Sequence, residues 1–156
     1  MYPHLLTLFT LFYLCAAQLG AEIFKPESND TISPGEKVNT QFQYNNMGVG
    51  QYTLDVNLWK DNGLNDLAYA VAHGIPLPSG NSTGTHVDFY MNSTYSWTVP
   101  HGLNETVYLT VHTNITSSTS NLTLRSAPIM LHVNSALSLI PSNLLLVFIL
   151  VLFFLK

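Results

Sequence analysis

A two-residue alternation of apolar and polar side chains runs through the middle of the chain and constrains its fold more than any other feature. Successive side chains of a β-strand point to opposite faces, so this alternation is typical of strands with one buried face. It recurs at residues 38–44, 52–58, 87–91, 95–99, 107–111, 122–124 and 129–133. Ile23 and Phe24 add a candidate first edge strand. The pattern predicts an all-β fold.

Turn-forming residues separate these stretches. Residues 33–36 read SPGE, with proline and glycine in the central positions that favour a type II turn. Residues 45–50 form a second candidate loop, and the PHG of 100–102 ends the stretch before it. Seven or eight short strands with such spacing predict a two-sheet β-sandwich of immunoglobulin-like type.

The stretch from residue 63 to residue 82 interrupts the alternation. Leu64, Leu67, Ala68 and Val71 fall at helical spacing, which predicts a short helix. The prolines and glycine of 76–80 then predict a loop, which would serve as a binding loop or a spacer.

The first residues have the features of a secretory signal peptide. An apolar run covers residues 5–14, and small residues precede a cleavage site after Ala17. The run is well short of the roughly 20 residues that a membrane span needs, which disfavours the alternative of an uncleaved anchor. We therefore predict a signal peptide at 1–17 and a mature domain at 18–134.

The last residues have the order of a glycosylphosphatidylinositol (GPI) attachment signal. Asn134 begins three small residues, a spacer covers 137–143, and an apolar run covers 144–155. This order predicts lipid attachment at Asn134, with Ser135 as the second choice, and a removed segment at 135–156. The alternative is a transmembrane tail, although Lys156 alone is a weak cytoplasmic flank.

Cysteine usage and charge exclude several classes of protein. The only cysteine, Cys15, lies in the predicted signal peptide, so the mature domain has no disulfide and depends on a hydrophobic core. Residues 18–134 carry four Lys or Arg against nine Asp or Glu, a net charge of −5. A nucleic-acid-binding surface needs a basic patch, which this domain lacks.

The mature segment contains six Asn-X-Ser/Thr sequons without proline in the middle, and each is a candidate acceptor for an N-linked glycan. The acceptor residues are Asn29, Asn81, Asn92, Asn104, Asn114 and Asn121. Glycans at these sites would cover much of a small domain.

Motifs for catalysis, metals or cofactors are missing from the sequence. The histidines have no metal-ligand spacing, and no nucleophile elbow or glycine-rich phosphate loop occurs. Paired carboxylates hydrolyse glycosides in many enzymes, and the plausible candidates here are Asp55, Asp61, Asp66 and Asp88. Their positions on polar strand faces and in loops fit solvation better. We predict no catalytic residue, no metal and no cofactor.

Two aromatic residues are candidates for a binding surface. Trp59 and Tyr90 are out of phase with the apolar faces of their strands, so they are predicted to point outward, where they could stack on sugar rings. Four other aromatic residues are in phase with valine and leucine, which predicts that they belong to the core: Tyr44, Tyr52, Tyr95 and Trp97.

Several segments carry a resemblance to a known group of proteins. They are residues 31–36 (TISPGE), 42–44, 50–59 (GQYTLDVNLW), 93–100 (STYSWTVP) and 107–111. Residues 24–133 resemble small secreted or GPI-anchored fungal surface proteins with one immunoglobulin-like domain. That group includes Ser/Thr-rich wall proteins and necrosis-inducing secreted effectors. The resemblance implies a wall or surface role and transfers no catalytic residue. The chain departs from the group in having almost no Ser/Thr-rich stalk.

These features predict a non-enzymatic, GPI-anchored glycoprotein on the outer face of the plasma membrane or in the cell wall. Its predicted partners are the membrane, through the lipid, and wall glycans or surface proteins. The alternatives are a secreted effector or interaction protein, and an enzyme acting on wall polysaccharide.

Overall fold

The computed structural model describes residues 20–80, 88–118 and 121–134, and in these residues the fold is all-β. The described chain forms nine strands and no helix. The strands are β1 (Glu22–Lys25), β2 (Thr31–Ile32), β3 (Lys37–Asn45), β4 (Gln51–Trp59), β5 (Leu67–Leu77), β6 (Tyr90–Thr98), β7 (Thr106–Thr116), β8 (Asn121–Arg125) and β9 (Ile129–Val133).

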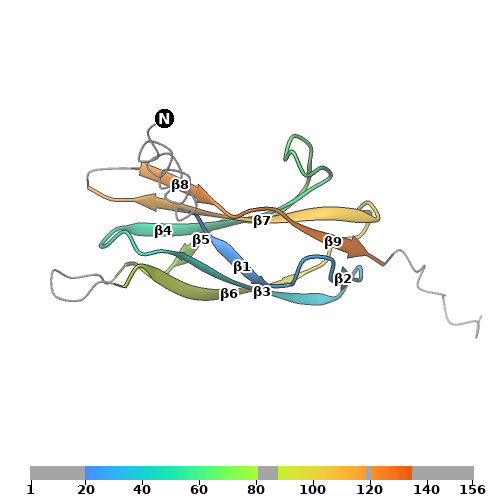
Figure 1. Ribbon diagram of the computed structural model, residues 1–156, viewed down its shortest axis with the longest axis horizontal. Coiled ribbons are helices and arrows are strands. Elements are labelled where there is room, and N and C mark those ends of the chain that lie inside the picture. The colour runs from blue at the N-terminus through green and yellow to red at the C-terminus, as the bar shows by residue number, and fades with distance from the viewer. Residues whose placement is uncertain (1–19, 81–87, 119–120, 135–156) are drawn as a thin grey trace, which may run out of the picture.

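The strands make two sheets that lie face to face (Figure 1). The small sheet has the order β1-β3-β6, and the large sheet has the order β2-β9-β7-β4-β5 with β8 also paired to β7. All described pairs are antiparallel except β2 with β9, which is parallel. The expected two-sheet sandwich is therefore present.

The first two strands connect the sheets. β1 pairs with β3 of the small sheet, and β2, only six residues later, pairs with β9 of the large sheet. Ile23 and Phe24 lie in β1, as the sequence predicted. One short segment thus holds the edges of both sheets together.

A serine joins the two strands on one edge of β7. β8 pairs with one half of β7 and β9 with the other half. Between them, the Ser126 backbone N–H donates to the Val111 carbonyl at 2.9 Å, and the Ser126 hydroxyl accepts from the Val111 N–H at 3.0 Å. The break in the edge therefore leaves no Val111 hydrogen-bonding group unpaired, as burial requires.

The alternation of β3, β4 and β7 directs one side chain in two into the space between the sheets. Their inward residues are almost completely buried, together with Trp97 of β6 and Val99, which follows that strand. The fully buried side chains are Tyr44, Phe42, Leu54, Leu58, Leu109, Leu131, Val56, Val99, Val107, Val111, Thr40 and Thr110. Except for Thr110, which faces outward, and Val99, which follows β6, these are inward positions of their strands. The predicted core positions of β3, β4 and β7 are confirmed.

The predicted helix between residues 63 and 82 is wrong, because this segment forms the edge strand β5. Its pairing with β4 shifts register between Leu54 and Val56, between Val56 and Asn57, and between Leu58 and Trp59. Each irregularity moves later side chains to the other face, which removes the two-residue alternation from the sequence.

Pro76 lies inside β5 and does not end it. Proline has no N–H for the ladder, and an edge strand tolerates this because one of its sides is unpaired. The strand predicted at 87–91 is also only partly correct. β6 begins at Tyr90, Phe89 is 72% exposed, and residue 87 lies outside the described part.

The described chain begins and ends at opposite ends of the sandwich (Figure 1). Gly20 N–H donates to the Asn45 side chain at 3.1 Å, at the end of β3. Asn134 N–H donates to the Ile32 carbonyl at 2.8 Å, beside the start of β3. The predicted signal peptide and removed tail lie outside the described residues. In the part that is described, no helix is long and apolar enough to cross a membrane.

Candidate functional site

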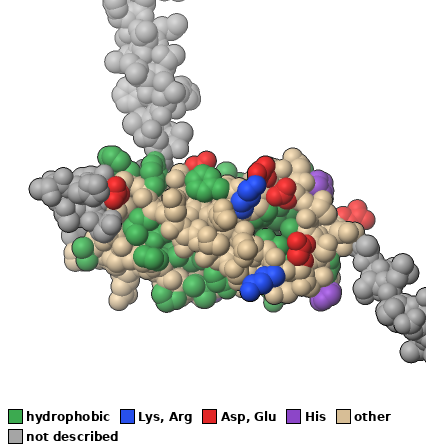
Figure 2. Space-filling model, turned by 90° about the horizontal axis from the view of Figure 1, so that it is seen from below, with side chains coloured by type: hydrophobic (Ala, Val, Ile, Leu, Met, Phe, Trp, Pro, Cys, Tyr) green, Lys and Arg blue, Asp and Glu red, His purple; other side chains and the backbone are tan. Residues whose placement is uncertain are grey.

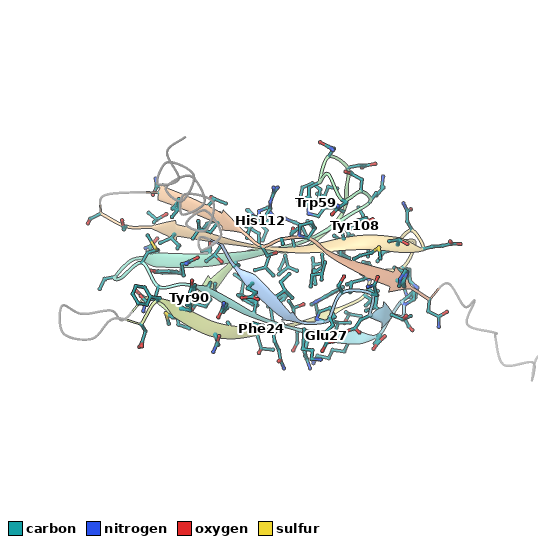
Figure 3. The ribbon with its side chains drawn as sticks, in the orientation of Figure 1. Phe24, Glu27, Trp59, Tyr90, Tyr108 and His112 are labelled. Atoms are coloured by element: carbon teal, nitrogen blue, oxygen red, sulfur yellow. The ribbon has the colours of Figure 1, made fainter. Side chains whose placement is uncertain are left out.

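The two predicted binding residues lie on different sheets (Figure 3). Trp59 is the last residue of β4 in the large sheet, whereas Tyr90 is the first residue of β6 in the small sheet. Tyr90 is 41% exposed and Trp59 is half-buried. The structure therefore does not bring Trp59 and Tyr90 together into one binding surface.

Trp59 instead belongs to a row of apolar side chains across the outer face of the large sheet. Trp59 lies opposite Leu67 of β5 on one side and Tyr108 of β7 on the other, and Tyr108 lies opposite Met130 of β9. We call Leu67, Trp59, Tyr108 and Met130 the cross-strand row. Sequence reasoning identified Trp59 but missed the other three, because their alignment depends on strand register.

The indole of Trp59 is held in place by a threonine. Its Nε1–H donates to Thr110 Oγ1 at 2.9 Å, and Thr110 Oγ1 lies 3.3 Å from His112 Nε2. Thr110 is fully buried although its side chain is on the outer face, because its neighbours cover it. The Trp59 indole is thus anchored by a side-chain hydrogen bond, which reduces the entropy that this side chain loses when a ligand binds.

A polar network centred on Asp55 lies further along the same face. Asp55 Oδ2 accepts from Asn114 Nδ2 at 2.9 Å, and Asp55 Oδ1 accepts from the Gly74 N–H at 2.7 Å. His73 Nδ1 lies 2.9 Å from the same Oδ1, and Thr123 donates to Asn114 Oδ1 at 2.8 Å. Asp55 is therefore fully used in fixing β5 and β7 to β4.

His112 lies between Asp55 of β4 and Arg125 of β8, directly opposite both. Burial lowers the pKa of His112, the positive charge of Arg125 lowers it further, and Asp55 opposes them. The neutral imidazole is therefore favoured in the folded protein.

We expect this depressed pKa to make folding stability depend on pH. Because the folded state binds the His112 proton more weakly than the unfolded state, stability decreases as pH falls below about 6.5. His112→Gln should lose less stability than wild type between pH 7 and pH 5 in urea unfolding. Arg125→Gln should raise the His112 pKa in an NMR titration. Identical pH profiles for wild type and His112→Gln would contradict this assignment.

The four candidate catalytic acids have structural contacts. Asp61 accepts from the backbone N–H groups of Asn65 and Asp66, which lowers the Asp61 pKa and stabilises the β4–β5 hairpin. Asp66 forms an exposed ion pair with Lys60 at 2.9 Å. Asp55 lies in its own network, and Asp88 precedes β6 of the other sheet. Among the described residues, no cluster of His, Cys, Asp and Glu has the geometry of a metal site.

The sequons differ in the exposure of their acceptor asparagines. Asn29, Asn92, Asn104 and Asn121 are exposed, and Asn81 lies outside the described residues. Asn114 is half-buried in β7, and its Nδ2, the atom to which a glycan would be attached, donates to Asp55. A glycan attached to this nitrogen would leave it with one N–H and would have to fit into a confined position. Asn114 is therefore the least accessible of the described acceptors.

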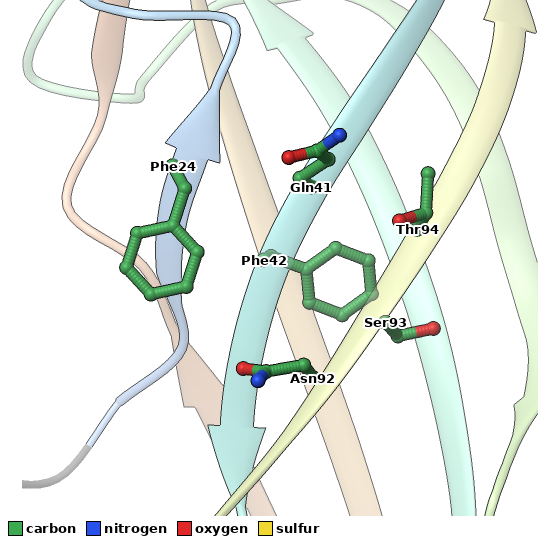
Figure 4. A pocket seen from close by; sticks show the side chains of 6 residues that line it. All are labelled: Phe24, Gln41, Phe42, Asn92, Ser93 and Thr94. Atoms are coloured by element: carbon green, nitrogen blue, oxygen red, sulfur yellow. The ribbon is translucent and has the colours of Figure 1, made fainter.

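An open groove of about 300 Å³ lies on the small sheet, a feature that the sequence analysis missed (Figure 4). Its lining residues are Phe24, Gln41, Phe42, Asn92, Ser93 and Thr94. Figure 2 shows this face of the molecule, where hydrophobic side chains lie among uncharged polar groups and charged groups gather toward the end that carries β2. No acid lines the groove.

Comparisons with known proteins add little to this description. No protein-family model matches the chain, and no curated protein matches its sequence. A solved structure of the alkylpurine DNA glycosylase AlkC of Pseudomonas fluorescens, bound to DNA containing an abasic site analog, is similar at a TM-score of 0.37 and 10% identity. The match covers 80% of this chain but 33% of the glycosylase, and a likeness this distant indicates neither fold nor activity.

Proposed function

We propose that the chain is a non-enzymatic glycoprotein held on the cell surface, or in the cell wall, by a GPI anchor at Asn134. The observation that carries this proposal is the exposure of four acceptor asparagines distributed around the sandwich. Asn92 lies on the small sheet, Asn121 on the large sheet, and Asn104 in the connection between β6 and β7. A secreted fate explains why acceptors occur on both faces, since glycans keep such a surface hydrated.

The strand order supports an immunoglobulin-like assignment. A first segment shared between the sheets, a small sheet of β1-β3-β6 and a large sheet built around β7 and β4 match the sandwich architecture of that class. This order also fits the resemblance to fungal surface proteins with one such domain.

The cross-strand row is the surface that we assign to binding. It combines Trp59 and Tyr108 with the exposed Leu67 on a face formed by four strands, and Thr110 fixes the indole. Flat aromatic surfaces of this kind stack on the C–H faces of sugar rings, so wall glycans or the glycans of a surface protein are the proposed ligands. The proposed role that would follow from such binding is adhesion or wall organisation.

The positions of the acids disfavour a glycoside hydrolase. Such an enzyme needs two carboxyl groups facing one cleft. In the described residues, Asp61 and Asp66 stabilise one hairpin while Asp55 joins three strands of the large sheet. A secreted interaction factor remains the alternative function, since it would use the same cross-strand row without the lipid.

We expect phospholipase C to release the protein from intact membranes of the expressing eukaryotic cell. After deglycosylation, the mass of the released chain should begin at Gln18 and end at Asn134 or Ser135 with the anchor remnant. Retention in the membrane with residues 135–156 still in the mass would show a transmembrane tail. Protein found only in the medium, without lipid, would establish the secreted alternative.

The same preparation tests the binding surface on a broad glycan array. Trp59→Ala should abolish binding, and Tyr90→Ala, on the opposite face, should leave it unchanged. Loss of binding with Tyr90→Ala alone would move the site to the small sheet, and no binding by wild type would remove glycans as ligands.

A further inference from the structure

The groove on the small sheet contains one complete sequon. Three of its six lining residues, Asn92, Ser93 and Thr94, form the Asn-Ser-Thr acceptor sequence in β6. Register places Gln43 opposite Asn92 and Gln41 opposite Thr94 on the neighbouring strand β3. A glycan on Asn92 would therefore start inside the groove, beside the Gln41 side chain that also lines it.

Phe24 forms the other wall of this groove. It lies on β1 at a shift of register between Ile23 and Lys25, and its side chain is 44% exposed. In Figure 4 the Asn92 side chain extends from β6 toward the Phe24 ring, across β3. A large aromatic side chain exposed beside an acceptor asparagine leaves apolar surface that the folded domain does not cover.

The chemistry of N-acetylglucosamine fits this arrangement. Its pyranose ring has one face of C–H groups, which favours contact with an aromatic ring because apolar surface is removed from water on both sides. Its hydroxyl and acetamide groups need hydrogen-bond partners, and the exposed Gln41 side chain lies in the groove. Within the described chain, the Asn92 side chain makes no hydrogen bond that a glycan would break, in contrast to Asn114.

We propose that the groove binds the first N-acetylglucosamine of a glycan on Asn92, and that this sugar ring stacks on Phe24. The inference rests on the proposed function, because the chain must enter the secretory pathway to be glycosylated. It goes beyond that function in giving one glycan a structural role. The sugar covers the exposed part of Phe24 and ties the edge strand β1 to β6 across β3.

The first test measures how fast a peptide N-glycosidase removes glycans from the native, full-length protein made in a eukaryotic cell, with each site followed by mass spectrometry. Phe24→Ala should increase the rate at Asn92 several-fold and leave the rate at Asn121 unchanged. An unchanged rate at Asn92 would overturn the proposal, as would a mass that shows Asn92 without a glycan. Phospholipase release of the same sample reports separately on the anchor.

The second test is a double-mutant cycle in thermal unfolding. With the Asn92 glycan present, Phe24→Ala should lower Tm by about 4 °C, the shift expected for loss of one aromatic contact in a domain of this size. Thr94→Val removes the glycan but retains Asn92, and in this background Phe24→Ala should lower Tm much less. In an Asn121→Gln background, Phe24→Ala should lower Tm as much as in wild type. If Phe24→Ala shifted Tm equally with and without the Asn92 glycan, the proposed sugar–Phe24 contact would be refuted. A dimer that Phe24→Ala dissociates would show that a second copy of the chain fills the groove instead.

Discussion

Leu58→Ala should lower the free energy of unfolding by about 2–5 kcal/mol. Leu58 is fully buried near the end of β4 in the large sheet, opposite Leu109 of β7. The truncation removes apolar contacts and leaves a cavity that closely packed neighbours cannot fill. Because Cys15 is the only cysteine of the chain, no disulfide within the chain offsets the loss.

Leu67→Ala is the matched control for this prediction, because it removes the same atoms from a side chain that is 46% exposed. Its effect should stay within about 0.5 kcal/mol. Urea unfolding followed by tryptophan fluorescence measures both variants, since Trp59 and Trp97 report on the two sheets. A similar loss for the two leucines would mean that the core is not where the structure places it.

Thr40→Val should cost about 1–3 kcal/mol, although it preserves the shape of the side chain almost completely. Thr40 Oγ1 accepts the indole proton of Trp97 at 2.9 Å, and both residues are buried between the sheets. Valine cannot accept this proton, so the variant leaves a donor buried without a partner, and that penalty exceeds the net value of an ordinary hydrogen bond.

Thr98→Val serves as the comparison, because Thr98 lies on the exposed face of β6, one residue after Trp97. It should change the unfolding free energy by about 0.5 kcal/mol at most. If Thr40→Val were as mild, the Trp97 indole would have to find another acceptor, and the hydrogen bond would not be a determinant of the core.

The sequence predicted strands wherever one face is buried and the ladder is regular. β3, β4 and β7 satisfy both conditions, and their alternation identified the inward side chains Phe42, Leu54 and Val111 correctly. β5 satisfies neither. It is an edge strand with repeated shifts of register, so its apolar residues fell by coincidence at helical spacing. Pairing partners, which the sequence alone does not supply, override local pattern in such segments.

Recognition of the candidate sites from the sequence was limited by strand register in the same way. Trp59 was recognisable because it is out of phase with Leu58, a property of one strand. Its neighbours Tyr108 and Met130 come from strands about 50 and 70 residues later, and only the pairing of β4, β7 and β9 aligns them. Likewise, the sequon at Asn92 could be recognised from three consecutive residues. Its proximity to Phe24 could not, because it depends on β3 lying between β1 and β6.

The hydrogen bond from Asn134 to Ile32 has a consequence for how the molecule would stand on a cell. An anchor attached at Asn134 would follow directly after β9, so almost no peptide linker would separate the sandwich from the anchor. A nine-residue strand spans about 30 Å, which sets the height of the opposite tip. That tip carries the exposed Met47 and Val49, so these two apolar side chains would face an approaching cell or wall polymer.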